Sequence, residues 1–181
     1  MILQAPPGRV APKRAQRAGL LAFLWPISGP NVTTVDFHFN TPDRLLHACR
    51  LIRKAVRSGQ VSETKPLLVF CGQPERLARF DDMLYEFSEE DFLPHVMADH
   101  PMADESPILL CPEPIVPGAA RHAFLLVNLD DEVPDCFSSF DRVFEIVGPE
   151  DDDKTQARKR FSFYRDRGYA IQQFDLSKTP R

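Results

Sequence analysis

The chain has 181 residues, enough for one domain with some additional tail, and 43% of them are hydrophobic, including 14 phenylalanines. A formal net charge of −4 argues against a general affinity for nucleic-acid phosphates, and no apolar run reaches the roughly 18 residues of a membrane span. The four cysteines are scattered without a C-x-x-C spacing, which indicates small buried side chains in a reducing cytoplasm and no zinc site. We therefore expect a soluble cytoplasmic protein with no membrane contact.

Residues 1–31 differ in composition from the rest of the chain. They contain five prolines and four basic residues but no acidic residue. Basic residues followed by the apolar residues 20–25 superficially resemble a secretory signal, but the apolar part is short and Pro26 interrupts it. Because patterned sequence begins at Val32, we expect residues 1–31 to be a disordered extension or a mis-assigned start. The domain is expected to cover residues 32–176, followed by a short tail at 177–181.

The first half of the domain reads as strand, helix and strand. Residues 35–39 alternate apolar and polar side chains, which predicts a strand with one covered face. A helix should open at residues 41–43 and close at the pair Ser58-Gly59. Its apolar residues recur at helical spacing: Leu45, Cys49, Ile52 and Val56. Residues 67–70 are apolar throughout, as expected of a strand buried on both faces.

The second half continues the alternation. A second helix is expected from Pro74, with one apolar side formed by Leu77, Phe80 and Leu84. Four more segments read as buried strands, and a helix over 150–167 lies between the last two. The four segments are residues 108–110, 123–127, 143–147 and 169–174. This order predicts right-handed βαβ crossovers. The expected fold class is α/β: a single domain with a largely parallel or mixed twisted sheet, helices on both faces and a Rossmann-like topology.

Catalytic signals are weak or absent. The turn after residue 70 has one glycine, Gly72, and Glu75 where a phosphate would sit, so no dinucleotide site is predicted. Walker A, H-E-x-x-H and G-x-S-x-G patterns do not occur. We interpret the acidic residues 150–153 as complementing a helix dipole and residues 130–132 as a solvated turn. None of the five histidines has a neighbouring nucleophile with an orienting acid. We expect no catalytic residue, no metal and no cofactor.

Residues 157–169 are the most informative part of the chain, because they are basic and aromatic on an acidic background. Arg158, Lys159, Arg160, Arg165 and Arg167 surround Phe161, Phe163 and Tyr164. On a helix, Phe161 and Tyr164 share a stripe, with Arg158 and Arg165 beside it and Ser162 between them. Such a surface suits a ligand with a carboxylate and an apolar group. The alternative, that the aromatics are core and the arginines a solvated face, stays open on the pattern alone.

Five segments taken in order resemble the chi subunit family of bacterial DNA polymerase III. They are residues 35–39, 92–95, 125–129, 140–147 and 157–169. The similarity runs from about residue 32 to residue 176, and members of the family typically start with a segment like residues 32–36. This start agrees with the domain boundary inferred from composition.

The resemblance implies a non-catalytic accessory subunit of the holoenzyme, associated with the clamp loader at the replisome. In this family, chi captures the acidic, phenylalanine-ending C-terminal tail of single-stranded DNA-binding protein, and contacts DNA only indirectly. Arg158 and Arg165 then serve the carboxylates of the tail, while Phe161 and Tyr164 form the apolar wall. Ser162 stands where some members carry a base, which predicts weaker tail binding here.

The family's other partner is the small psi subunit, which bridges chi to the clamp loader. Tyr85 and Phe92 flank an acidic turn and are candidates for that surface; the alternative that both are core side chains stays open. Two further functions remain: a small cytosolic α/β enzyme that uses the carboxyl edge of the sheet, and a protein that binds single-stranded DNA directly or associates with a helicase. Direct DNA binding predicts an affinity that falls steeply with salt.

Overall fold

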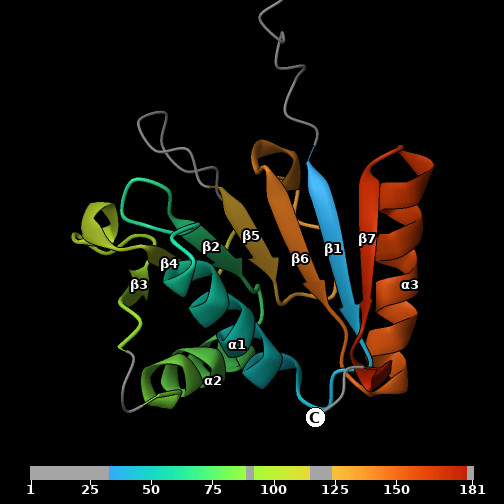
Figure 1. The fold of residues 1–181 in the computed structure, drawn as a ribbon, viewed down its shortest axis with the longest axis horizontal. Helices are drawn as coiled ribbons and strands as arrows, with labels where there is room; N and C mark the ends of the chain where they lie inside the picture. Colours follow the sequence, from blue (N-terminus) through green and yellow to red (C-terminus); the bar gives the residue numbers. More distant parts are fainter. Residues whose placement is uncertain (1–32, 89–91, 115–123, 179–181) are drawn as a thin grey trace, which may run out of the picture.

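The computed structural model describes residues 33–88, 92–114 and 124–178. Within them, seven strands form a single sheet in the order β3-β4-β2-β5-β6-β1-β7 (Figure 1), and all six pairings between neighbouring strands are parallel. The strands are β1 Thr34–Phe39, β2 Leu67–Phe70, β3 His95–Met97, β4 Ile108–Cys111, β5 Leu125–Asn128, β6 Arg142–Ile146 and β7 Ala170–Asp175. The α/β class with a parallel sheet is therefore confirmed.

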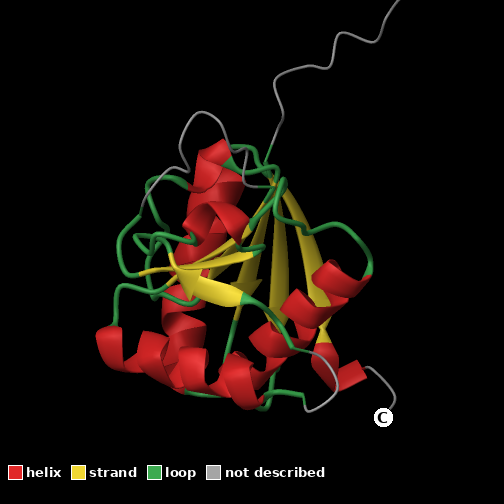
Figure 2. Ribbon diagram, turned by 90° about the vertical axis from the view of Figure 1, so that its left-hand side faces the viewer, coloured by secondary structure: helices red, strands yellow, loops and turns green. Residues whose placement is uncertain are grey.

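Three α-helices lie among these strands, and they cover both faces of the sheet as expected (Figure 2). They are α1 Arg44–Arg57, α2 Pro74–Glu86 and α3 Asp151–Asp166, with short 3-10 turns at Ala103–Glu105, Phe137–Ser139 and Leu176–Lys178. Helices α1 and α2 pack on one face, and α3 with the turn at Phe137–Ser139 packs on the other. Strand β3 and the 3-10 turns were not predicted, because three residues are too few to show a hydrophobic period.

Two expectations fall wholly or partly outside these residues. The predicted extension at residues 1–31 lies outside the described part of the chain, and so do residues 179–181 of the predicted tail. None of the helices in the described part is both long and apolar enough to cross a membrane.

Helix α1 begins slightly later than the sequence suggested. Asp43 has an extended backbone and caps the helix, its carboxylate accepting a hydrogen bond from the amide of Leu46 at 2.9 Å. The helix ends at Arg57 with Ser58 as its C-cap, and Gly59 follows with φ of +71°, a left-handed conformation that glycine adopts without steric cost. The predicted apolar face is confirmed for Leu45, Cys49 and Ile52, all of which are buried, while Val56 is partly buried.

The prediction that β1 has one exposed face is wrong. Its polar residues Asp36 and His38 are only 1% and 6% exposed, because β1 lies between β6 and β7 and polar partners cover both side chains. The guanidinium of Arg142 donates to the Asp36 carboxylate at 2.8 Å. The His38 ring stacks on Phe174 with centroids 4.7 Å apart, and its Nδ1 lies 3.2 Å from Nε2 of His47.

A buried polar group fastens α3 to the sheet. Glu145 of β6 is fully buried, and it accepts hydrogen bonds from Arg160 Nε at 2.8 Å and from the Tyr164 hydroxyl at 2.9 Å. Asn128 Nδ2 adds a third bond to the same carboxylate at 3.0 Å, and Arg160 also donates to the carbonyl of Asp131. Burial raises the pKa of Tyr164, and the neighbouring Glu145 carboxylate raises it further. Arg160 is thus a structural residue, so the basic cluster of residues 157–169 is not wholly directed at a partner.

Removing one member of this buried pair should be costly. We expect Arg160→Ala to lower the free energy of unfolding by about 3–5 kcal/mol, because Glu145 would stay buried without its counter-charge. Chemical denaturation of both proteins measures the difference. The neighbouring Lys159 is exposed, so Lys159→Ala is the matched control and should change stability by less than about 0.5 kcal/mol. A loss below about 1 kcal/mol for Arg160→Ala would contradict the anchoring role.

The two adjacent imidazoles predict a pH-dependent stability. The pKa of His38 is lowered to about 4, mainly by burial and also by the charge of His47. The pKa of His47 is likewise lowered to about 4, by burial and by the charge of Arg50. As the pH falls, the unfolded chain therefore takes up these protons at about pH 6.5, whereas the folded chain takes them up only at about pH 4. Stability should be highest above pH 6.5 and fall as the pH drops toward 4, by up to about 1.4 kcal/mol per pH unit for each imidazole.

Urea denaturation of the wild type and of His47→Gln at several pH values between about 4 and 7 tests this dependence. The variant should show a shallower slope, because one of the two groups no longer titrates. Equal slopes for the two proteins would show that His47 does not contribute.

Candidate functional site

A surface pocket of about 270 Å³ opens between α3 and the carboxyl ends of β1 and β7. It is lined by Phe37, Phe39, Asn40, Val147, Lys154, Ala157, Arg158, Phe161 and Gln173. The sheet contributes one wall and α3 the other, so the pocket exists only because α3 is held on the sheet. Most of its lining side chains are apolar, as is typical of a ligand-binding pocket.

The apolar wall is closely packed on the sheet side. Phe37 is 4% exposed, and its ring packs edge-on against Phe161 with centroids 5.2 Å apart. Asn40 follows β1 with φ of +59°, and its amide donates to Asp175 at 2.8 Å. This contact joins the carboxyl ends of β1 and β7 beside the pocket.

Two cations stand on the rim of this pocket. Lys154 and Arg158 are one helical turn apart on α3, so they lie on the same side of the helix. Arg158 is exposed and forms no ion pair with any residue of the described part of the chain. Lys154 pairs with the exposed carboxylate of Asp151, at 3.1 Å. An apolar pocket edged by available cations suits a ligand that carries both a carboxylate and a hydrophobic side chain.

The structure brings together some of the predicted site residues and separates others. Arg158 and Phe161 line the pocket, as the sequence suggested. The assignment of Tyr164 to the pocket wall is wrong, because its side chain is fully buried with its hydroxyl on Glu145. Arg165 is exposed and pairs with its neighbour Asp166 at 2.9 Å, two helical turns beyond Arg158. Ser162 is partly buried and does not line the pocket.

Several pocket residues were not predicted. Lys154 lies four residues before Arg158, so helical spacing alone would have found it. Phe37 and Phe39 occupy alternate positions of β1, and this alternation also was visible in the sequence. Gln173 comes from an edge strand, and only the pairing of β7 with β1 places it there.

The candidate partner surface at Tyr85 and Phe92 is exposed. Each side chain is 70% accessible to solvent, so the alternative that both belong to the core is wrong. Tyr85 lies at the end of α2 and Phe92 follows it, with residues 89–91 outside the described part of the chain. Large exposed aromatic side chains of this kind are enriched at protein interfaces.

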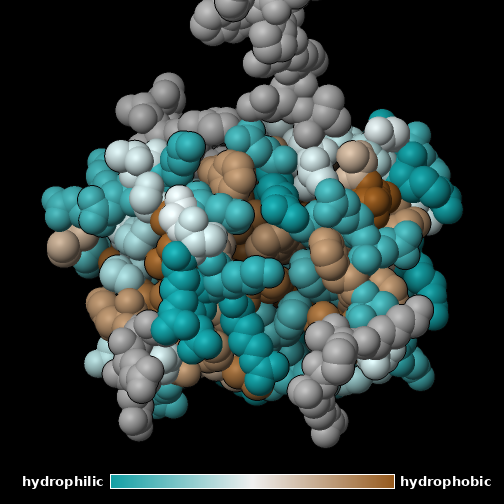
Figure 3. Space-filling view, viewed as in Figure 1, coloured by the Kyte–Doolittle hydropathy of each residue, from teal (hydrophilic) through white to brown (hydrophobic). Residues whose placement is uncertain are grey.

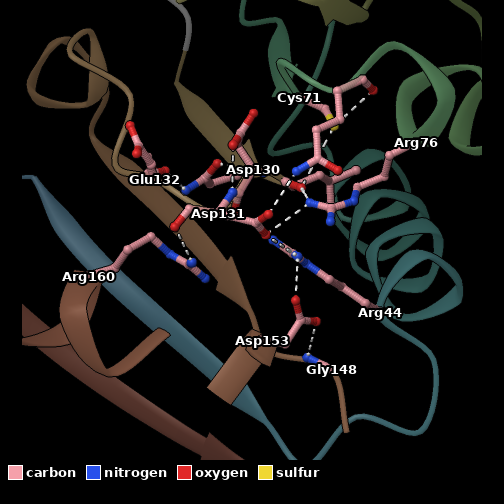
Figure 4. A network of polar contacts seen from close by, with 12 residues as sticks. Arg44, Cys71, Arg76, Asp130, Asp131, Glu132, Gly148, Asp153 and Arg160 are labelled. Atoms are coloured by element: carbon pink, nitrogen blue, oxygen red, sulfur yellow. Dashed lines mark hydrogen bonds and ion pairs between the residues drawn. The ribbon is translucent and has the colours of Figure 1, made fainter. Parts of the chain in front are cut away.

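The carboxyl edge of the sheet is closed by the chain's own charges (Figure 4). The amide of Gly72 donates to the Asp130 carboxylate at 2.5 Å, and a Cβ at Gly72 would lie 2.8 Å from the same oxygen. A carboxylate of the protein therefore occupies the position at which a Rossmann-type loop would bind a phosphate.

The neighbouring carboxylate of Asp131 forms ion pairs with two guanidinium groups, those of Arg44 at 3.3 Å and of Arg76 at 3.1 Å, so that a polar network covers this edge. The interpretation of residues 130–132 as a solvated turn is confirmed for Glu132, which is exposed in a bend, but it is wrong for Asp130 and Asp131, which are partly buried in this network. The acidic residues 150–153 begin α3 as expected, and Asp153 additionally binds Arg44 and the amide of Gly148.

Other groups that could carry chemistry are also engaged or shielded. All four cysteines are buried free thiols, and burial raises the pKa of Cys49 and of Cys111 to about 12. His95 lies between Asp81 at 3.1 Å and the carbonyl of Leu93 at 2.6 Å. Among the described residues, no three His, Cys, Asp or Glu side chains are grouped so as to hold a metal ion.

Comparison with known families matches residues 32–172 to the family described as DNA polymerase III chi subunit, HolC. The DNA polymerase III subunit chi of Pseudomonas aeruginosa is 35% identical over 152 residues, which cover 81% of this chain and 99% of the relative. The subunits chi of Haemophilus influenzae and Escherichia coli are 29% and 28% identical, over 68% and 78% of this chain and 81% and 89% of their own lengths.

Two solved structures share the fold at low sequence identity. T4 UvsW superposes with a TM-score of 0.57 at 7% identity, over 81% of this chain and 42% of that chain. Domain 2 of the DEAD-box helicase Mss116p, bound to an RNA duplex, superposes with a TM-score of 0.51 at 12% identity. The match covers 83% of this chain and 65% of that chain. At these identities the likeness concerns the α/β architecture alone.

Proposed function

Because the chain belongs to the DNA polymerase III chi subunit family, we propose that it is a non-catalytic accessory subunit of the holoenzyme that captures the acidic C-terminal tail of single-stranded DNA-binding protein. The observation that carries this proposal is the apolar pocket between α3 and β1, with Lys154 and Arg158 on its rim. Both features of the tail, a terminal phenylalanine and acidic residues, find a complement there.

The arrangement of the pocket suggests how the tail binds. The terminal aromatic ring enters between Phe39 and Phe161, and the terminal carboxylate pairs with Arg158. Arg165 lies about 10.5 Å further along α3, given the helical rise per residue. Three residues of extended chain span about the same distance. Arg165 is therefore placed to pair with an acidic residue upstream of the terminus.

The alternatives receive less support from the same residues. An enzyme at the carboxyl edge of the sheet would need open polar groups, and there Asp130 and Asp131 bind the chain's own donors. Direct DNA binding by α3 would need a continuous row of available cations. That row is interrupted, because Arg160 is buried and Arg167 lies over the Phe163 ring at 3.6 Å.

Tyr85 and Phe92 support a second contact, with a psi-type subunit of the clamp loader. The two rings lie at the end of α2, whereas the tail pocket is formed by α3 with β1 and β7. Separate surfaces would let the protein hold both partners at the same time. This is the arrangement that a link between the clamp loader and single-stranded DNA-binding protein requires.

Replacing the rim arginine tests the tail site. We expect Arg158→Ala to weaken binding of a fluorescent peptide with the acidic, phenylalanine-ending sequence by about 1–3 kcal/mol, because a charge-assisted contact is lost. Fluorescence anisotropy measures this as a rise of about 5- to 150-fold in Kd. Lys159→Ala is the matched control, since Lys159 is an exposed cation on α3 that does not line the pocket. Unchanged affinity for Arg158→Ala would place the tail elsewhere.

The psi-type contact has its own test. The double substitution of Tyr85→Ala and Phe92→Ala should weaken binding to a purified psi subunit by tenfold or more, about 1.4 kcal/mol, because exposed aromatics are frequent hot spots. Isothermal titration with the full chain gives the affinity. Met102→Ala is the control, since Met102 is another exposed apolar side chain, and tail-peptide binding should be the same in all variants. Retention of full psi affinity by the double variant would rule out this surface.

A further inference from the structure

Helix α1 carries a concentration of positive charge that the proposed function does not use. Its fourteen residues include five Arg or Lys and no acid, in a chain whose net charge is −4. Four of the five lie in the last eight residues of the helix: Arg50, Arg53, Lys54 and Arg57. The fifth, Arg44, is buried in the network at the carboxyl edge of the sheet. The overall acidity of the protein therefore conceals a local basic surface.

These four cations are gathered around a concave surface. A hollow of about 440 Å³ is lined by Arg50, Arg53, Lys54, Arg57 and Ser58. Arg50, Lys54 and Arg57 are exposed, and the helical spacing places them along one side of α1. Figure 3 shows hydrophilic side chains over α1 in the middle of this face of the molecule. Converging cations with a serine hydroxyl form a surface on which phosphate oxygens can be bound.

The charges on this surface are not neutralised from within the helix. Arg50 and Lys54 are four residues apart, and like charges at this spacing destabilise a helix by about 0.2–0.5 kcal/mol. Neither forms an ion pair within the described part of the chain. Arg53 lies over the Phe87 ring at 5.2 Å, which holds its guanidinium near the hollow. Favourable interaction with the carboxyl end of the helix dipole accounts for Lys54 and Arg57 in the last turn, but not for Arg50.

We propose that this face of α1 binds the phosphate backbone of DNA. The tail pocket lies beside α3, on the opposite face of the sheet from α1. DNA bound by a single-stranded DNA-binding protein that is held in that pocket can therefore reach α1 without competing for the same residues. The contact is electrostatic and independent of base sequence, because it uses Arg and Lys on phosphates. It does not depend on tail capture, so each function can fail separately.

Removal of Arg50 and Lys54, which form no ion pair within the described part of the chain, tests the proposal. The full chain is titrated into a labelled single-stranded oligothymidine of about 20 nucleotides and into a duplex of the same length, and anisotropy is followed between about 50 and 200 mM salt. We expect binding that weakens with salt, and a loss of tenfold or more in affinity at low salt for Arg50→Gln combined with Lys54→Gln. The slope of the logarithm of affinity against the logarithm of salt concentration should be smaller for the variant. The decrease should be about 0.7 per lost phosphate contact on single strands and about 0.9 on duplex.

The matched control is Lys65→Gln combined with Lys159→Gln, which removes the same total charge from exposed positions elsewhere. This control should retain DNA affinity within about twofold. All variants should bind the tail peptide like the wild type, which shows that they are folded and separates this result from the proposed function. Absence of DNA binding at low salt, or an equal loss in the control, would overturn the proposal. Preference for single strands or duplex then identifies the DNA that α1 meets.

Discussion

The buried carboxylate of Glu145 is the contact on which the pocket between α3 and β1 depends. It lies on β6 at zero exposure and binds both Arg160 and Tyr164 of α3. These bonds fix the rotation of α3, because Arg160 and Tyr164 lie one turn apart and both must point at the sheet. Arg158 is then directed to the surface and Phe161 to the pocket. A buried ion pair is weak evidence of net stability, but it specifies one orientation of the helix, and the pocket requires that orientation.

The chain's own polar contacts occupy the carboxyl edge of the sheet. In open parallel sheets, ligands bind at the carboxyl ends of the strands, where helix N-termini and loop amides are available. Here the Asp130 carboxylate accepts a hydrogen bond from the amide of Gly72, and Asp131 forms ion pairs with Arg44 and Arg76. The helix surfaces remain available instead. The pocket lies beside α3, the exposed aromatic side chains lie at the end of α2, and the basic hollow lies on α1. The sheet is a scaffold that separates three surfaces.

Much of the fold could be predicted from the sequence, for clear physical reasons. The apolar runs of β2 and β4 and the helical spacing of Leu77, Phe80 and Leu84 reflect burial that each segment must achieve in any packing. Arg158 and Phe161 were also predicted to share one surface of a helix, and both line the pocket. The error at β1 has a physical cause: Asp36 and His38 read as exposed, whereas Arg142 and His47 from other elements cover them.

The sequence by itself determined all three α-helices and every strand except β3, because local hydrophobic spacing and caps are properties of neighbouring residues. It also determined that residues 157–169 combine cations with aromatic rings. Only the tertiary structure decided which of these side chains are available to a ligand. Arg158 and Arg160 are two positions apart on α3, yet one is exposed and the other lies on Glu145. That difference is set by the distant strand β6, and no local pattern contains it.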